Sequence, residues 1–330
     1  MKSTLHDLAS IQSGKTDRIK SMFFRISSIK HVVPVIIVIV LMSSFSSCKR
    51  RCIEGDGYYV VQSRHVSGDI YGVELDGSFN VYVTKDSVQS IEVDADSNLL
   101  PYISTRLRNQ GILLIDSEKE CMKPDRSINI YVSTPYLNSI TLDGSGNIDV
   151  DSIDALEGII NLNGSGTIYL YAAVCDEFII NMDGSGVITV NDIVSDNCEV
   201  NHFGSGDIEI HNVYTINDID AFLDGSGRIE IYNIDSRDVQ AVHDGSGIIE
   251  LEGYVDHASD LKLTGSGEIR AIRMLQYDCD AYISGSGSIF VHVDDFLTVD
   301  IPGSGVVYYR GNPIITLLGG TSWEQVIPVY

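Results

Sequence analysis

Apolar and polar residues alternate along most of this chain, and the alternation restarts about every 20 residues. Each restart is marked by the tripeptide Gly-Ser-Gly, which begins at Gly144, Gly164, Gly184, Gly204, Gly225, Gly245, Gly265, Gly285 and Gly303. Four residues after the first glycine, every copy has a β-branched residue, from Ile148 to Val307. Such period-two alternation predicts strands with one buried face. Each unit is expected to be a strand, a corner, a second strand and a looser return.

A fixed period of this length indicates stacked repeats. One unit cannot bury its apolar face alone, but identical neighbours stacked on it build a continuous core. A β-propeller needs about twice this period per blade, and antiparallel hairpins would not bring identical side chains into register. The pattern therefore predicts an all-β fold, a parallel β-helix or β-solenoid with coils of about 20 residues and Gly-Ser-Gly corners.

Each corner has a local explanation in the sequence. Glycine adopts positive φ without steric cost, which suits a corner that recurs at one place. The residue before the triplet is mostly polar, as in Asp143, Asn163, Asp183, Asp224, Asp244, Thr264 and Ser284. Asx side chains hydrogen-bond the backbone two residues on, so a role in the turn is expected. The alternative is an acidic ladder that binds cations.

The repeat divides the chain into expected regions. Residues 139–313 are expected to form the regular solenoid, and residues 314–330 a C-terminal cap. Over residues 57–138 the triplet is missing but strand patterns continue, so an irregular β region that caps the solenoid is expected. Within it, Val73–Val83 resembles one degenerate repeat in which Phe79 replaces the second glycine.

The first 47 residues have the pattern of an export signal. Val32 to Met42 is an apolar run too short to span a bilayer and of the length of a signal-peptide core. The small residues before Cys48 predict a lipoprotein signal peptide over residues 1–47, lipid attachment at Cys48 and a lipid-anchored tether over residues 48–56. An inner-membrane anchor and simple secretion are the alternatives. The short basic lead after Met22 predicts that this residue is the true start.

The composition is strongly acidic. From Cys48 onward, 44 acidic and 16 basic residues give a net charge of −28, and only six basic residues lie beyond Arg126. No nucleic acid partner is expected, because phosphate contacts need clustered Lys and Arg. The acidity indicates a solvated exterior, and recruitment of cations or basic partners is the alternative.

Cysteine spacing argues against disulfides in the repeats. Cys198 and Cys279 share a repeat position but lie four coils apart, about 19 Å, which exceeds disulfide reach. We therefore expect free, buried thiols there, and Cys52–Cys121 as the pair to test. No Cys-x-x-Cys motif or histidine cluster occurs, so neither a metal nor a cofactor is expected.

Candidate catalytic groups are few. No triplet serine lies in a Gly-x-Ser-x-Gly elbow, and no phosphate loop or dinucleotide fingerprint occurs. His202 and His243 stand two residues before their triplets, with Leu223 between them, about 10 Å apart. We expect them to be core residues, and a catalytic or metal-binding pair is the alternative.

One group of charged positions falls on an outer face of the predicted solenoid. Arg228 and Arg270 are two coils apart and share this face with the acidic residues Glu209, Glu230 and Glu250. A solvated charged surface is expected. A carboxylate-lined catalytic groove is the alternative, since grouped carboxylates perform glycoside cleavage.

Four segments and the triplet series together resemble a known family. The segments are Cys52–Gly57, Leu75–Val83, Asp94–Ile103 and Pro135–Ile140, and the likeness spans about Cys52 to Pro313. This pattern is similar to the head GIN domain family, described as autotransporter adhesins and common in Bacteroidetes. The resemblance implies an exported β-solenoid, often a lipoprotein, and it supplies no catalytic residues.

Two functional hypotheses follow. The first is a non-enzymatic lipoprotein of the bacterial cell envelope, at the outer membrane and facing the periplasm or the surface. It would be an adhesin or a structural module that binds a glycan or protein through repeated weak contacts on its solenoid faces. The second is a carbohydrate-active β-helix enzyme, a polysaccharide lyase or hydrolase. They differ in whether a bound polysaccharide is cleaved.

Overall fold

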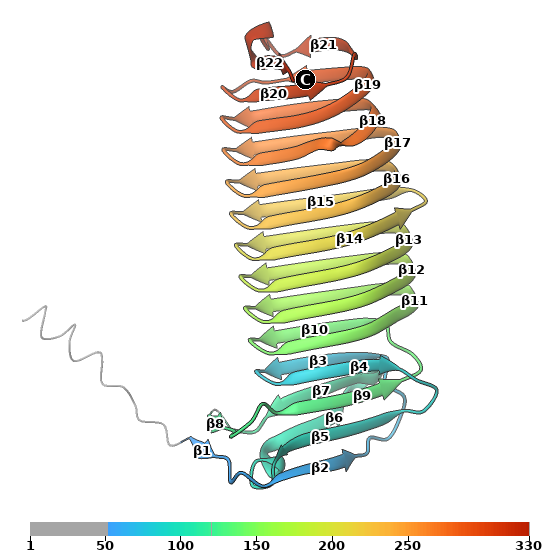
Figure 1. Cartoon of the computed structure of the whole chain (residues 1–330), viewed down its shortest axis with the longest axis vertical. Helices are drawn as coiled ribbons and strands as arrows, with labels where there is room; N and C mark the ends of the chain where they lie inside the picture. Colours follow the sequence, from blue (N-terminus) through green and yellow to red (C-terminus); the bar gives the residue numbers. More distant parts are fainter. Residues whose placement is uncertain (1–51, 120, 330) are drawn as a thin grey trace, which may run out of the picture. The chain divides into compact units, whose positions relative to one another are not determined.

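The computed structural model describes residues 52–119 and 121–329. The predicted signal peptide, the start at Met22 and the lipid site Cys48 lie outside the described residues. The described chain is built of strands, with three short 3-10 turns, and its parallel coils stack into a solenoid of about ten turns (Figure 1). The predicted fold class is confirmed. No helix within this part of the chain is long and apolar enough to cross a membrane.

Most regular coils are one long strand that runs from one Gly-Ser-Gly corner to the next and bends between them (Figure 1). The strands are β10 (Ser139–Gly144), β11 (Asn147–Gly164), β12 (Thr167–Gly184), β13 (Val187–Gly204), β14 (Asp207–Thr215), β15 (Asp218–Gly225), β16 (Arg228–Gly245), β17 (Ile248–Gly265), β18 (Glu268–Gly285) and β19 (Ser288–Asp300). Between β11 and β12 the parallel ladder has three segments, which start at Asn147, Ser152 and Glu157. The expectation of a looser return is wrong, because these residues also pair with the neighbouring coils.

Equivalent residues of successive coils stack and form the core. Ile148 pairs with Ile168, and Val150 pairs with Leu170. The first of these two rows stays fully buried up to Val307. Full burial of an aliphatic side chain stabilises a fold by about 1.5–3 kcal/mol relative to exposure. The regular row therefore selects the parallel register in which every β-branched residue lies above its equivalent.

The corners are held by hydrogen bonds between coils. The N–H groups of Ser165 and Gly166 donate to the carbonyl oxygen of Gly144 in the preceding coil, at 2.9 and 3.1 Å. Positive φ at the first glycine is confirmed in seven triplets, from Gly144 to Gly265. The expected Asx turn is wrong. Among the described residues, no side chain before a triplet accepts from the corner backbone, and Asn163 instead donates to the Asp143 carboxylate at 2.6 Å.

The N-terminal region mixes parallel and antiparallel pairing. It contains β1 (Ile53–Glu54), β2 (Tyr59–Arg64), β3 (Gly72–Gly77), β4 (Asn80–Lys85), β5 (Ser90–Asp96), β6 (Ile103–Leu107), β7 (Ile112–Ser117), β8 (Met122–Lys123) and β9 (Asn129–Thr134). Strands β3 and β4 continue the parallel column, pairing with β10 and β11. The prediction of a degenerate repeat at Val73–Val83 is confirmed, because Gly77 lies in register with Gly144. Antiparallel pairs link β2 with β5, β5 with β9, and β6 with β7.

The C-terminal end continues the column and then covers its last corner. It contains β20 (Val306–Arg310), β21 (Ile314–Leu318) and β22 (Val326–Pro328). The Gln325 side-chain amide donates to the carbonyl oxygens of Gly303 and Gly305, at 3.1 and 3.3 Å. The final Gly-Ser-Gly corner thus receives from a side chain the hydrogen bonds that other corners receive from the next coil.

The cysteines are distributed as expected. A disulfide joins Cys52 to Cys121. Cys175, Cys198 and Cys279 are free and buried. The ladder rises from Cys198 through Ile219, Val239 and Ser259 to Cys279, which confirms the four-coil separation. Burial raises the pKa of the Cys175 thiol to about 11 and the pKa values of Cys198 and Cys279 to about 12.

Candidate functional site

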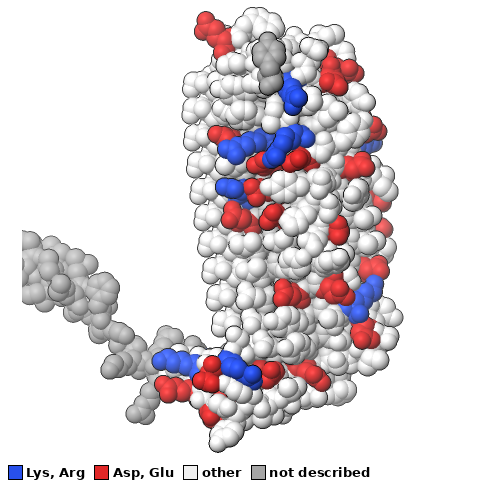
Figure 2. Space-filling model, viewed as in Figure 1, with Lys and Arg blue, Asp and Glu red and all other residues white. Residues whose placement is uncertain are grey.

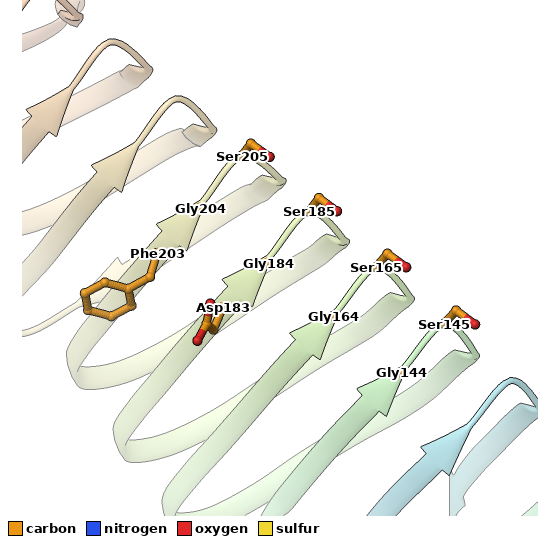
Figure 3. A pocket seen from close by; sticks show the side chains of 10 residues that line it. All are labelled: Gly144, Ser145, Gly164, Ser165, Asp183, Gly184, Ser185, Phe203, Gly204 and Ser205. Atoms are coloured by element: carbon orange, nitrogen blue, oxygen red, sulfur yellow. The ribbon is translucent and has the colours of Figure 1, made fainter. Parts of the chain in front are cut away.

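A groove runs along the Gly-Ser-Gly corners of four successive coils (Figure 3). It is shallow and widely open to solvent, with a volume of about 710 Å³. Its lining, which we call the corner groove, consists of Gly144, Ser145, Gly164, Ser165, Asp183, Gly184, Ser185, Phe203, Gly204 and Ser205. The Gly-Ser-Gly pattern predicted turns at these corners, and a groove along them was not predicted from the sequence.

The corner groove presents a row of hydroxyl groups. Figure 3 shows Ser145, Ser165, Ser185 and Ser205 at the tips of successive corners. The backbone N–H groups of these serines are used in bonds to the preceding coil. Their hydroxyl groups form no hydrogen bond with any residue that the structure describes, so they are available to a ligand. The row repeats at the strand spacing of about 4.8 Å.

Phe203 gives the corner groove an aromatic side (Figure 3). It stands immediately before its triplet, where most other coils have a polar residue, and 44% of its surface is exposed. Its ring packs against that of Phe222 on the next coil, with 5.4 Å between centroids and a tilt of 50°. Asp183 occupies the equivalent position one coil earlier. Sequence reasoning missed Phe203, although its departure from the polar row was a visible signal.

The charged outer face predicted from sequence exists, and its charges are paired. Glu209, Glu230, Glu250 and Arg270 are successive ladder partners. Arg270 lies 3.8 Å from the Glu250 carboxylate, and Arg228 lies 3.1 Å from Glu230. Figure 2 shows this mixture of basic and acidic residues on the upper part of the column.

A further arginine joins this charged face. Arg273 donates to Glu250 and lies 3.4 Å from the Glu252 carboxylate. The hydrogen bond that Arg273 donates to Glu250 raises the pKa of the Arg273 guanidinium, so it stays charged. Glycoside cleavage needs one carboxyl group as acid and one as base or nucleophile. Glu230 and Glu250 instead neutralise arginines, and this arrangement favours a structural surface.

The two unusual histidines lie in the core, as expected. His202, Leu223 and His243 are successive ladder partners, and both rings are fully buried. His202 Nε2 bonds the carbonyl oxygen of Gly206 at 2.8 Å, and His243 Nδ1 bonds that of Leu223 at 3.1 Å. The alternative of a catalytic or metal-binding pair has no support from this packing. Within the described residues, no group of three or more ligand-type side chains is placed to hold a metal ion.

Comparison with known proteins points to one family. The sequence profile of the family described as "Putative auto-transporter adhesin, head GIN domain" matches residues 71–233 and 199–313. A search of curated proteins gave no match.

Solved structures support the fold. One is a putative lipid binding protein from Parabacteroides distasonis, with 22% identity and a TM-score of 0.50, covering 85% of this chain and 100% of that one. A putative adhesin from Parabacteroides merdae has 18% identity and a TM-score of 0.50, covering 84% of this chain and 97% of that one. A putative adhesin from Parabacteroides distasonis has the same identity and TM-score, with coverage of 84% and 98%.

Proposed function

The chain belongs to the head GIN domain family of auto-transporter adhesins, and on that premise we propose that it is a non-enzymatic adhesin of the bacterial envelope. The protein is exported, carries lipid on Cys48 and is held at the outer membrane. Its solenoid presents the corner groove to a glycan. The observation that supports this most strongly is that the exposed ring of Phe203 and a row of serine residues line the same groove.

The chemistry of the corner groove suits a sugar chain. A sugar ring has an apolar face of C–H groups and an edge of hydroxyl groups. An exposed aromatic ring covers the apolar face, and Phe203 offers one that Phe222 holds in place. The serine hydroxyls and the Asp183 carboxylate supply donors and acceptors for the sugar hydroxyls.

Repetition supplies the affinity that one coil lacks. Each corner contributes one hydroxyl, and a single hydrogen bond is worth only about 0.5–1.5 kcal/mol net. A polymer that crosses several corners forms its later contacts intramolecularly, which raises the overall affinity. A regular column of equivalent corners is therefore suited to a repetitive ligand.

A glycan array tests this proposal, using the wild type, Phe203→Asp and Phe296→Ala. Phe203→Asp restores the polar residue found before other triplets, so the fold is expected to persist. Phe296 is an exposed phenylalanine on β19, outside the groove, and serves as the matched control. We expect Phe203→Asp to weaken binding about tenfold, the equivalent of one lost ring contact, and Phe296→Ala to leave it unchanged.

A product analysis distinguishes the adhesin hypothesis from the enzyme hypothesis. The same glycans are incubated with the protein and then analysed for shorter products. Binding without cleavage supports the adhesin. Release of shorter saccharides would favour the carbohydrate-active enzyme. Binding that is unaffected by Phe203→Asp would place the ligand outside the corner groove.

A further inference from the structure

Two backbone donors in the first Gly-Ser corner of the column have no partner among the residues that the structure describes. In the corner above it, the N–H groups of Ser145 and Gly146 donate to the carbonyl oxygen of Gly77, at 3.1 and 3.0 Å. The equivalent residues in the first corner are Ser78 and Phe79. Their N–H groups form no hydrogen bond with any residue in the described ranges. Because corner donors point towards the preceding coil, these two are expected to point towards the N-terminal end of the column.

A pocket lies where the preceding corner would be. Strand β7 is in register with β3 up to Asp116, which pairs with Asp76. This ladder ends there, and parallel pairing with the column resumes at Asn129, where β9 pairs with β4. Between the first corner and the intervening segment, the detour, is a pocket of about 660 Å³, which we call the N-terminal pocket. Its lining includes Ser78, Phe79, Asn80, Lys119, Asp125 and Arg126.

Among the described residues, the basic side chains of the N-terminal pocket have no ion-pair partner, whereas two of its three carboxylates have partners. Lys119 and Arg126 form no ion pair with any described residue of this acidic chain. Asp116 pairs with Arg106 at 2.6 Å. Asp125 accepts a hydrogen bond from the Tyr59 hydroxyl group. The remaining carboxylate, on Asp76, is exposed to water.

Long-range contacts hold Arg126 in place. Its guanidinium lies 3.3 Å from the centroid of the Tyr59 ring, whose hydroxyl group binds Asp125. The fully buried carboxylate of Asp96 accepts the N–H of Asp125 at 3.0 Å and that of Gly57 at 2.9 Å. The detour is also tied to the start of the fold by the Cys52–Cys121 disulfide. A wall fixed in this way loses little conformational freedom when a ligand binds.

The two ends of the column of corners differ in whether their open hydrogen-bonding groups have described partners. At the C-terminal end, Gln325 supplies donors to the two carbonyl oxygens that the last corner leaves open. At the N-terminal end, no side chain of the described residues supplies an acceptor to Ser78 and Phe79. Two adjacent residues whose N–H groups have no described partner line a concave site together with two cationic residues, and these are the elements of an anion-binding nest.

We propose that the N-terminal pocket binds a phosphate group. Phosphate oxygens accept hydrogen bonds from the N–H groups of Ser78 and Phe79, and Lys119 and Arg126 neutralise its charge. The volume of the pocket exceeds that of an inorganic phosphate ion, so a phosphate ester fits it better. This assignment uses a different surface from the corner groove and does not depend on the adhesin function.

Two sources offer this chemistry, namely a phospholipid headgroup and a free phosphorylated solute. Cys52 follows Cys48 by four positions in the sequence, a span of at most about 14 Å. A chain that carries lipid on Cys48 therefore holds the Cys52–Cys121 edge of the pocket close to the headgroups of its own membrane. The experiment distinguishes the two sources.

Isothermal titration of the purified full chain tests the proposal with two probes in separate arms. One probe is inorganic phosphate, and the other is dihexanoyl phosphatidylglycerol below its micelle concentration. The test variant is Lys119→Gln, whose side chain contacts the Tyr102 ring at 5.3 Å and no carboxylate among the described residues. The matched control is Lys123→Gln, which removes the same charge from the same detour but does not line the pocket.

We expect Lys119→Gln to weaken binding of both probes about tenfold, as loss of one charge-assisted hydrogen bond requires, and Lys123→Gln to change it less than about twofold. Tighter binding of the lipid would identify a headgroup, and equal or tighter binding of phosphate would identify a free solute. Either result supports the pocket. Equal losses in both variants would show diffuse charge attraction and overturn the proposal, as would failure of the wild type to bind either probe.

Discussion

Gly184 lies directly against Gly164 of the preceding coil. A Cβ atom at Gly184 would come within 2.3 Å of the Gly164 carbonyl oxygen, and the backbone of Gly184 has a φ of 138°. The same close approach recurs at the first glycine of each triplet, from Gly144 to Gly303. Glycine is therefore required at this position for two reasons. In most coils the backbone has a positive φ, and in all of them the neighbouring backbone leaves no room for a Cβ atom.

Substitution of the first glycine is predicted to be costly. Gly184→Ala forces an L side chain into a positive φ and into contact with Gly164, so we expect a loss of at least about 2 kcal/mol in the free energy of unfolding. Ser185→Ala, in the same triplet, removes only an exposed hydroxyl group and is expected to stay within about 0.5 kcal/mol. Urea unfolding followed by circular dichroism measures both. Equal stability of the two variants would contradict the packing argument.

The repeat positions explain which features the sequence could predict. The β-branched residue four positions after each first glycine predicted a buried row, and Ile148 and Ile168 stack as expected. The separation of Cys198 from Cys279 followed from the same count. The predicted turn role of Asp143 was wrong, because that prediction considered only hydrogen bonds within one corner. The corner N–H groups instead bond the Gly77 carbonyl oxygen of the preceding coil.

Replacement of a buried histidine by leucine is predicted to stabilise the solenoid. His202 Nδ1 is buried without a described partner, and the carbonyl oxygen of Gly206 keeps its bond from the Arg228 N–H. Leucine occupies this position in other coils, such as at Leu162 and Leu223. We expect His202→Leu to raise the free energy of unfolding by about 1 kcal/mol.

Thermal unfolding of His202→Leu beside His211→Leu checks this prediction. His211 is partly exposed and pairs with Glu209, so its replacement is expected to change stability by less than about 0.5 kcal/mol. A large destabilisation by His202→Leu would mean that the imidazole is needed in the core.

Stability is predicted to fall at alkaline pH. Burial raises the pKa values of Cys198 and Cys279 to about 12, whereas unfolded thiols ionise near pH 9. The contribution of the two buried thiols to the free energy of unfolding is fully present below about pH 9. Between about pH 9 and about pH 12 the unfolded chain has lost protons that the folded chain retains, so the free energy of unfolding decreases.

The slope of stability against pH measures this effect. Urea midpoints of the wild type and of Cys198→Ala are compared at about pH 8 and about pH 11. The variant is expected to be less stable at the lower pH, because it leaves a cavity, but to lose less stability as the pH rises. Parallel decreases in the two proteins would contradict the assignment to the thiol.

Loss of the disulfide is predicted to loosen the N-terminal region selectively. Cys52 and Cys121 are 69 residues apart, a loop for which chain entropy predicts about 4 kcal/mol of stabilisation. In a stacked protein, each coil depends mainly on its neighbours. Hydrogen exchange of Cys52→Ser/Cys121→Ser is expected to show faster exchange in β2–β9 and little change in β16–β18. Equal loss of protection along the whole column would contradict this view.

The N-terminal pocket shows where prediction from sequence stops. Gly77-Ser78-Phe79 resembled a degenerate corner, but its unpaired donors depend on what lies in the preceding coil. The segment there is held by the carboxylate of Asp96. It accepts hydrogen bonds from the N–H groups of Gly57 and Asp125, which are far from it in the sequence. Such contacts have no period, so counting along the repeat does not reveal them. The corner groove was more accessible to prediction, because Phe203 departs from the row of polar residues that precede the other triplets.

The central claim is that repeated corners bind a glycan through many weak contacts. Affinity measured for oligosaccharides of increasing length, drawn from the glycan class found on the array, tests it most directly. Four corners span about 14 Å at the strand spacing, so affinity is predicted to rise with each sugar up to about four and then level off. Phe203→Asp should lower the whole series. Affinity that is independent of length, or equal in Phe203→Asp, would contradict the account.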